Sequence, residues 1–148
     1  SNCGFFSFVV AGHRSNLGVA VGSVSGTMLD GNPDPDNPVP TINLHGTSDS
    51  IVPYNGGTAY TAIPTVLSYW ANKNGANATP VITNLTSGST SIEKSVYSDS
   101  SGTDWVEHYK INGGQHVWFD LDLSGSGTND LIWSFFSKHG LNGPLSNP

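Results

Sequence analysis

The sequence has little of three things: cysteine, positive charge and long apolar runs. Its 148 residues include one cysteine, Cys3, so no disulfide can form within the chain. Five lysines and arginines stand against 11 aspartates and glutamates, giving a net charge of -6. Nucleic-acid binding needs clustered basic side chains, so nucleic acid is excluded as an expected partner. No apolar run approaches the roughly 20 residues of a membrane-spanning helix, so no membrane span is expected.

The chain is expected to form one domain over residues 1–148. Its length suits a single domain, 36% of its residues are hydrophobic, and neither a linker nor an internal repeat divides it. Serine, threonine, asparagine and glycine supply most of its polar character. This composition is common in exported microbial proteins, so a secreted or periplasmic location is expected.

Hydrophobic periodicity predicts alternating helices and strands. Apolar residues at helical spacing predict three helices, and β-branched or alternating runs predict four strands. The predicted helices cover 4–14, 64–73 and 128–139, and the predicted strands cover 17–26, 40–46, 91–98 and 104–111. Such alternation predicts an α/β fold in which a small, mostly parallel sheet is flanked by helices. Thr128 is expected to cap the last helix, and Gly140 to end it.

Two loops that follow predicted strands carry residues suited to catalysis. Asp49 follows the strand at 40–46, and His116 follows the strand at 104–111. In open α/β sheets, functional residues collect at the carboxyl ends of the strands. A carboxylate can orient an imidazole, which then takes a proton from a serine hydroxyl. Ser1, Asp49 and His116 occur in the chain order Ser, Asp, His that α/β-hydrolases use.

Several segments resemble a known family at consistent spacing along most of the chain. They are SNCG, VGSVSGTM, HGTSDSIVPYNGG, IPTVLSYWANKNG, INGGQHVW and LIWSFFSKHG. Together they resemble the C-terminal half of the polyhydroxybutyrate depolymerase and feruloyl esterase-like α/β-hydrolases. In that family the nucleophile lies in a Gly-x-Ser-x-Gly elbow, and SNCG matches this elbow from the serine onward. Cys3 stands where the family has the second glycine.

The resemblance implies a carboxylic-ester hydrolase that acts on small or polymeric esters through an acyl-enzyme. It implies Ser1 as nucleophile, Asp49 as orienting acid and His116 as general base. The backbone N–H of Asn2 would be one donor of the oxyanion hole, and the second would come from a segment preceding the nucleophile. No cofactor and no metal are expected.

Some alternatives stay open at this point. Trp118 either lines the substrate pocket or belongs to the core, and the same holds for Tyr54. Ser1 could act through its own α-amine as base, as in N-terminal nucleophile hydrolases. Asp30, Asp34 and Asp36 are candidate Ca²⁺ ligands, but prolines interrupt them and no calcium-loop spacing is present.

A second hypothesis treats the chain as a hydrolase fragment with impaired activity. No strand precedes Ser1 to hold it rigidly, and a half-sheet leaves an unpaired edge and an uncovered face. We therefore expect a homodimer or a higher oligomer in which the apolar segment at 17–26 is central.

Overall fold

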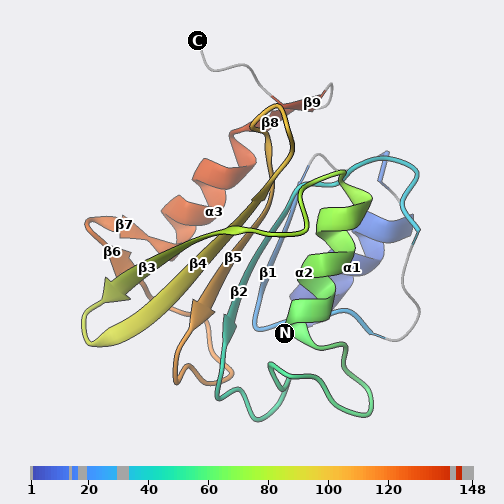
Figure 1. Ribbon diagram of the computed structural model, residues 1–148. Coiled ribbons are helices and arrows are strands. Elements are labelled where there is room, and N and C mark those ends of the chain that lie inside the picture. Colours follow the sequence, from blue (N-terminus) through green and yellow to red (C-terminus); the bar gives the residue numbers. More distant parts are fainter. Residues whose placement is uncertain (1, 14, 17–19, 30–33, 141–142, 145–148) are drawn as a thin grey trace.

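A five-stranded mixed sheet with helices on both faces organises the chain (Figure 1). The computed structural model describes residues 2–13, 15–16, 20–29, 34–140 and 143–144. The helices are α1 (Asn2–His13), α2 (Ile63–Lys73) and α3 (Thr128–Phe136). The strands of the sheet are β1 (Val21–Val24), β2 (Thr41–Gly46), β3 (Val81–Ser87), β4 (Thr90–Ser98) and β5 (Asp104–Ile111). Two small hairpins pair β6 (Asp122–Leu123) with β7 (Ser126–Gly127), and β8 (His139–Gly140) with β9 (Gly143–Pro144).

The strand order β1-β2-β5-β4-β3 corrects the expectation of a mostly parallel sheet. β1, β2 and β5 run parallel, whereas β4 is antiparallel to both β5 and β3. Strands joined by a short turn must run antiparallel, because only a longer crossover can bring the chain back in the same direction. The turns after β3 and β4 are short, so half of the strand pairings are antiparallel.

Two apolar layers cover the two faces of the sheet. One layer lies between the sheet and helices α1 and α2, and the other lies beneath α3 (Figure 1). Alternation along β2 explains the division, because Ile42 and Leu44 face α3 while Asn43 and His45 face the opposite side. All four side chains are fully buried. The α1 and α2 face therefore contains polar groups that need internal hydrogen-bond partners.

Helix α2 forms where its apolar stripe predicts it. Ile63, Val66, Leu67 and Trp70 are buried, and a proline lies in the first turn. Gly75 adopts φ +70° just past the helix end. The N–H groups of Gly75 and Ala76 bond to the carbonyls of Asn72 and Ala71, which is a glycine-terminated Schellman arrangement.

The ends of the other helices differ from the prediction. α3 ends at Phe136 rather than at Gly140, and His139 belongs to strand β8. Gly127 occupies the N-cap position, so Thr128 is the first helical residue rather than the cap. On α1 the buried face comprises Gly4, Phe8, Ala11 and Gly12, which leaves Val9 exposed.

Strand β3 was not predicted, because its residues show no apolar alternation. Most of its side chains are exposed, since it is the outer strand of the antiparallel half of the sheet. Its backbone pairs with β4 along seven residues, and that pairing rather than burial makes it a strand. None of the described helices is long and apolar enough to cross a membrane.

Candidate active site

The two loops singled out in the sequence meet at one edge of the sheet. β2 and β5 are parallel neighbours, so their carboxyl ends lie side by side at the lower edge in Figure 1. Asp49 follows the end of β2 and His116 follows the end of β5. Backbone hydrogen bonds join the loops, from Thr47 N–H to the Ile111 carbonyl at 3.0 Å and from Ser48 N–H to the Gly114 carbonyl at 2.9 Å.

Glycines allow this close approach of the two loops. A Cβ added at Gly46 would lie 2.1 Å from the carbonyl oxygen of Gly114, well inside van der Waals contact. Gly113 has φ +74°, a left-handed conformation that glycine adopts without strain. The Gly-Gly pair in front of His116 therefore serves to bring this loop against the end of β2.

Asp49 accepts hydrogen bonds on both carboxylate oxygens. Its Oδ1 accepts the backbone N–H groups of Ile51 at 2.9 Å and Val52 at 2.8 Å, and its Oδ2 lies 2.8 Å from Nδ1 of His116. Burial raises the pKa of Asp49, but the bonds from Val52, His116 and Ile51 outweigh burial and hold the pKa below its ordinary value. The side chain is therefore an ionised, fully buried carboxylate at neutral pH.

His116 has the orientation of a general base. Because Asp49 is ionised and can only accept, Nδ1 of His116 carries the hydrogen of their 2.8 Å bond. In the neutral ring the lone pair is then on Nε2, in a side chain that is 22% exposed. In serine hydrolases a carboxylate fixes the tautomer of the catalytic imidazole in this way.

The other predicted site residues have different placements. Ser1 lies outside the described residues. Asn2 is the exposed first residue of α1, where backbone N–H groups have no partner within the helix.

Trp118 is 59% exposed and lies beside His116, so it is a surface residue rather than core. Tyr54 is half-buried, and its hydroxyl donates to Nε2 of His108 at 2.9 Å.

The start of α1 lies close to the same edge of the sheet. A Cβ added at Gly4 would lie 3.1 Å from the Cα of Gly26, which follows β1. The neighbouring Ser25 donates its hydroxyl to the carbonyl of Val117 at 2.8 Å. A short series of contacts therefore connects the first turn of α1 with the loop that carries His116.

Ser25 is a residue that the sequence did not single out. Its φ of +52° is unusual for a residue other than glycine, and such conformations gather at functional sites. The hydrogen bond from its hydroxyl to Val117 and one from its backbone N–H to Leu44 hold it in place. No sequence signal marks this strain, because serine in a Ser-Gly pair is also common in ordinary turns.

A cavity of about 260 Å³ opens beside His116. Val24, Ser25, Val117 and Trp118 complete its lining, so both polar and apolar groups adjoin the imidazole. Its size suits a small group held next to a reacting centre. Tyr54 is not among the residues that line it.

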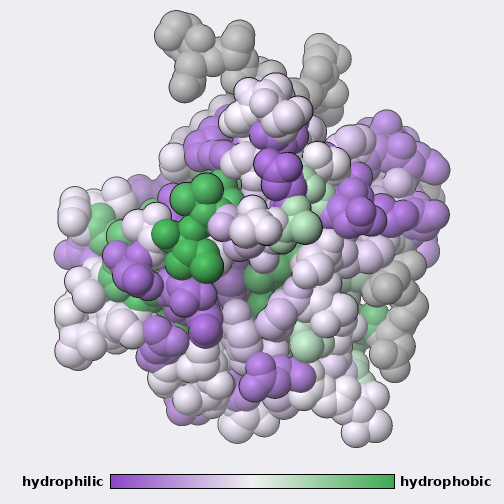
Figure 2. Space-filling model, viewed as in Figure 1, coloured by the Kyte–Doolittle hydropathy of each residue, from purple (hydrophilic) through white to green (hydrophobic). Residues whose placement is uncertain are grey.

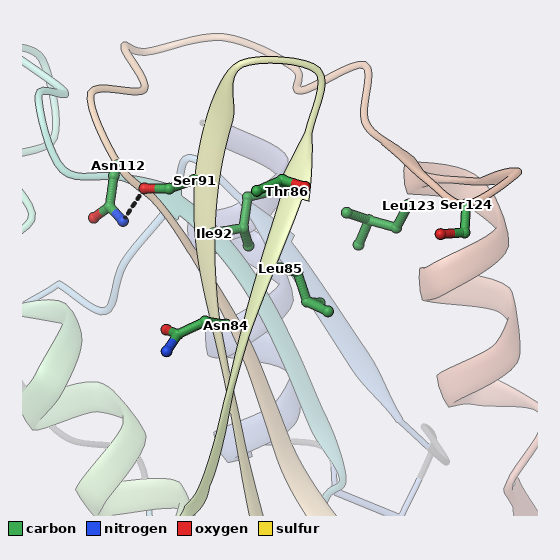
Figure 3. Close-up of a pocket in the computed structure, with 8 residues that line it drawn as sticks. All are labelled: Asn84, Leu85, Thr86, Ser91, Ile92, Asn112, Leu123 and Ser124. Atoms are coloured by element: carbon green, nitrogen blue, oxygen red, sulfur yellow. Dashed lines mark hydrogen bonds between the residues drawn. The ribbon is translucent and has the colours of Figure 1, made fainter.

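A larger cavity of about 460 Å³ lies away from the Asp49–His116 pair, at the tip of the β3–β4 hairpin (Figure 3). Figure 3 shows Asn84 and Asn112 on one side of the hairpin and Leu85 and Leu123 on the other. Adjacent residues of a strand point to opposite faces, so the lining side chains do not converge on one ligand. We assign no site to this cavity.

No protein-family model matches the chain, and no curated protein matches it. We therefore infer its function from the geometry around Asp49 and His116.

Proposed function

We propose that the chain is a serine esterase, a carboxylic-ester hydrolase of the α/β-hydrolase class that resembles polyhydroxybutyrate depolymerases and feruloyl esterases. One observation carries the proposal. A buried, ionised Asp49 holds the Nδ1–H of His116 at 2.8 Å and leaves Nε2 free beside an open cavity. The order Ser, Asp, His along the chain supports the same conclusion.

The proposed reaction has two steps. Nε2 of His116 takes the hydroxyl proton of Ser1 as Ser1 Oγ attacks the ester carbonyl carbon, and the backbone N–H of Asn2 stabilises the oxyanion. The alcohol leaves with the proton from His116, and an acyl-serine ester forms. Water, deprotonated by His116, then attacks the acyl carbonyl and releases the carboxylic acid with Ser1 restored. Both steps balance without a cofactor or a metal.

Ser1→Ala is expected to lower the turnover of a 4-nitrophenyl butyrate probe by at least about a thousandfold, because no nucleophile is left to form the acyl-enzyme. Labelling of the unchanged chain with a fluorophosphonate, followed by peptide mass mapping, should place the label on Ser1. Ser7→Ala is the matched control, since Ser7 lies in α1 and its hydroxyl donates to the Cys3 carbonyl. Unchanged turnover in Ser1→Ala, or a label on Ser25, would contradict Ser1 as nucleophile.

We also propose that the chain forms a homodimer through its β1 edge. Self-association is what the hypothesis of a hydrolase fragment with impaired activity predicts. Among the described strands β1 pairs only with β2, and α1 packs against β1 with Phe6 68% and Val9 45% exposed. The opposite edge strand, β3, carries exposed Val81 and Ile82, and Figure 2 shows apolar surface on that side of the molecule. Exposed apolar groups beside an open strand edge favour association.

Light scattering is expected to give the mass of a dimer for the unchanged chain and of a monomer for Phe6→Ser. Removing the aromatic ring from α1 takes away apolar area beside the β1 edge. Trp133→Ser is the control, because Trp133 is equally exposed, at 72%, but lies on α3 at the opposite face of the sheet. A monomeric mass for the unchanged chain at micromolar concentration would refute self-association.

A further inference from the structure

Two imidazoles, not one, contact the carboxylate of Asp49. On one side Oδ2 meets Nδ1 of His116 at 2.8 Å, and on the other it lies 3.3 Å from Nε2 of His45. The side chains of His45 and Asp49 are both fully buried. His45 is the next-to-last residue of β2, so the strand itself carries this second ring to the base of the loop that holds Asp49.

The hydrogen-bond partners of His45 determine its tautomer. Its Nε2 lies 2.8 Å from the carbonyl oxygen of Val52, and a carbonyl only accepts. Nε2 therefore carries the hydrogen and donates it to the Val52 carbonyl, while Oδ2 of Asp49 lies 3.3 Å from the same nitrogen. The same Val52 donates its backbone N–H to Oδ1 of Asp49, so His45 and the carboxylate are held by one peptide segment.

His45 is a neutral ring. Burial lowers its pKa, against the opposing effects of the Val52 carbonyl and of Asp49, and the nearby His116 lowers it further. A neutral donor can orient the carboxylate without adding a second positive charge beside His116. Asp49 is thus free to stabilise the charge that His116 gains when it takes a proton.

The surroundings of His45 restrain its ring. Tyr54 packs edge-on against it with ring centroids 6.1 Å apart. The Tyr54 hydroxyl donates to Nε2 of His108, and Nδ1–H of His108 donates to the Asn43 carbonyl at 3.1 Å. Tyr54 therefore restricts the ring of His45, and the buried His108 fixes Tyr54 in turn.

We propose that His45 is a positioning residue that holds Oδ2 of Asp49 in place for His116 through its Nε2–H. The catalytic consequence of this proposal rests on the proposed esterase function, but the geometric part does not. In the proposed reaction His45 transfers no proton and touches no substrate. It acts only on the carboxylate: the positive end of its N–H dipole lies 3.3 Å from Oδ2, and its bond to the Val52 carbonyl holds the segment whose N–H donates to Oδ1.

The first test needs no variant and no activity. Nitrogen-15 NMR of the unchanged chain at pH 7 reports which ring nitrogen of each histidine carries the hydrogen. The proposal requires the Nε2–H tautomer for His45 and the Nδ1–H tautomer for His116. An Nδ1–H tautomer at His45 would overturn it, because Nε2 would then have no hydrogen to offer Asp49.

The second test compares three variants by the proton resonance of the His116 Nδ1–H. His45→Leu removes the donor and should shift or broaden this resonance, whereas His45→Gln, which places an amide N–H near the lost Nε2, should largely restore it. His139→Leu is the matched control: it removes another buried histidine, which packs against Trp105 and Phe135 rather than beside Asp49 or Tyr54. An unchanged resonance in a folded His45→Leu would overturn the proposal.

The third test measures kcat and KM for ester hydrolysis. His45→Leu is expected to lower kcat by about ten- to a hundredfold with KM unchanged, because a misplaced acid-base pair affects only the chemical step. His45→Gln should recover most of that loss. If the unchanged chain hydrolyses no ester, the esterase proposal fails while the two NMR measurements still decide the role of His45. If it does, equal kcat in His45→Leu and the unchanged chain overturns the positioning role.

Discussion

Replacing His116 with alanine is expected to lower kcat/KM for a short-chain aryl ester by about 10⁶-fold, and Asp49→Asn by about 10⁴-fold. His116 supplies the only lone pair in the Asp49–His116 pair that can take a proton from a nucleophile. An asparagine at position 49 retains the shape of the carboxylate, but it loses the negative charge that fixes the Nδ1–H tautomer and stabilises the imidazolium. The loss in both variants should be in kcat, because neither group is needed to hold the substrate.

Two control variants separate this effect from a loss of structure. His13→Ala removes an exposed histidine at the end of α1. Asp99→Asn changes a loop carboxylate that also accepts several hydrogen bonds, which hold its pKa at about 2, but that lies at the opposite end of β5. Both controls should hydrolyse the ester within a factor of about two of the unchanged chain. Equal losses in Asp99→Asn and Asp49→Asn would show that the Asp49 effect is structural.

Gly46→Ala is expected to destabilise the fold by about 3 kcal/mol or more, and to abolish hydrolysis as well. The new methyl group would lie 2.1 Å from the carbonyl oxygen and 2.3 Å from the carbonyl carbon of Gly114. Neither backbone can yield easily, because the adjacent hydrogen bonds of Thr47 and Ser48 already join the two loops. Separating the loops would also move Asp49 away from His116.

Urea unfolding followed by tryptophan fluorescence measures this loss. Gly57→Ala is the matched control, since it also lies in the loop after β2 but a Cβ there meets nothing within 4 Å. We expect the control to change the free energy of unfolding by less than about 0.5 kcal/mol. A Gly46→Ala chain with the unfolding midpoint of the unchanged chain would contradict the close approach of the two loops.

The sequence was most informative where local pattern and tertiary packing agree. Apolar spacing predicted a helix at 64–73, and α2 forms there with Ile63, Val66, Leu67 and Trp70 buried. The strand expected at 40–46 likewise became the interior strand β2. Asp49 and His116 could be paired in advance because both follow strands, and the carboxyl ends of neighbouring parallel strands meet at one edge.

Prediction failed where pairing between segments, rather than hydrophobic periodicity, decides the structure. β3 shows no apolar alternation and is a strand because β4 offers it a row of backbone partners. α3 stops at Phe136 although its helical periodicity continues to His139, because the following residues pair as β8 and β9. The mixed character of the sheet likewise depends on which strands lie side by side, which hydrophobic periodicity does not report.

The same division applies to the candidate site. The identities of Asp49 and His116, and the type of chemistry they support, could be read from residue types and from their places after strands. The second imidazole beside Asp49, the left-handed Ser25 and the cavity beside His116 arise only when separate segments pack together. A residue's chemistry is a property of its side chain, but its hydrogen-bond partners, burial and backbone strain are properties of the folded neighbourhood. Those are the quantities that turn an aspartate and a histidine into an oriented pair.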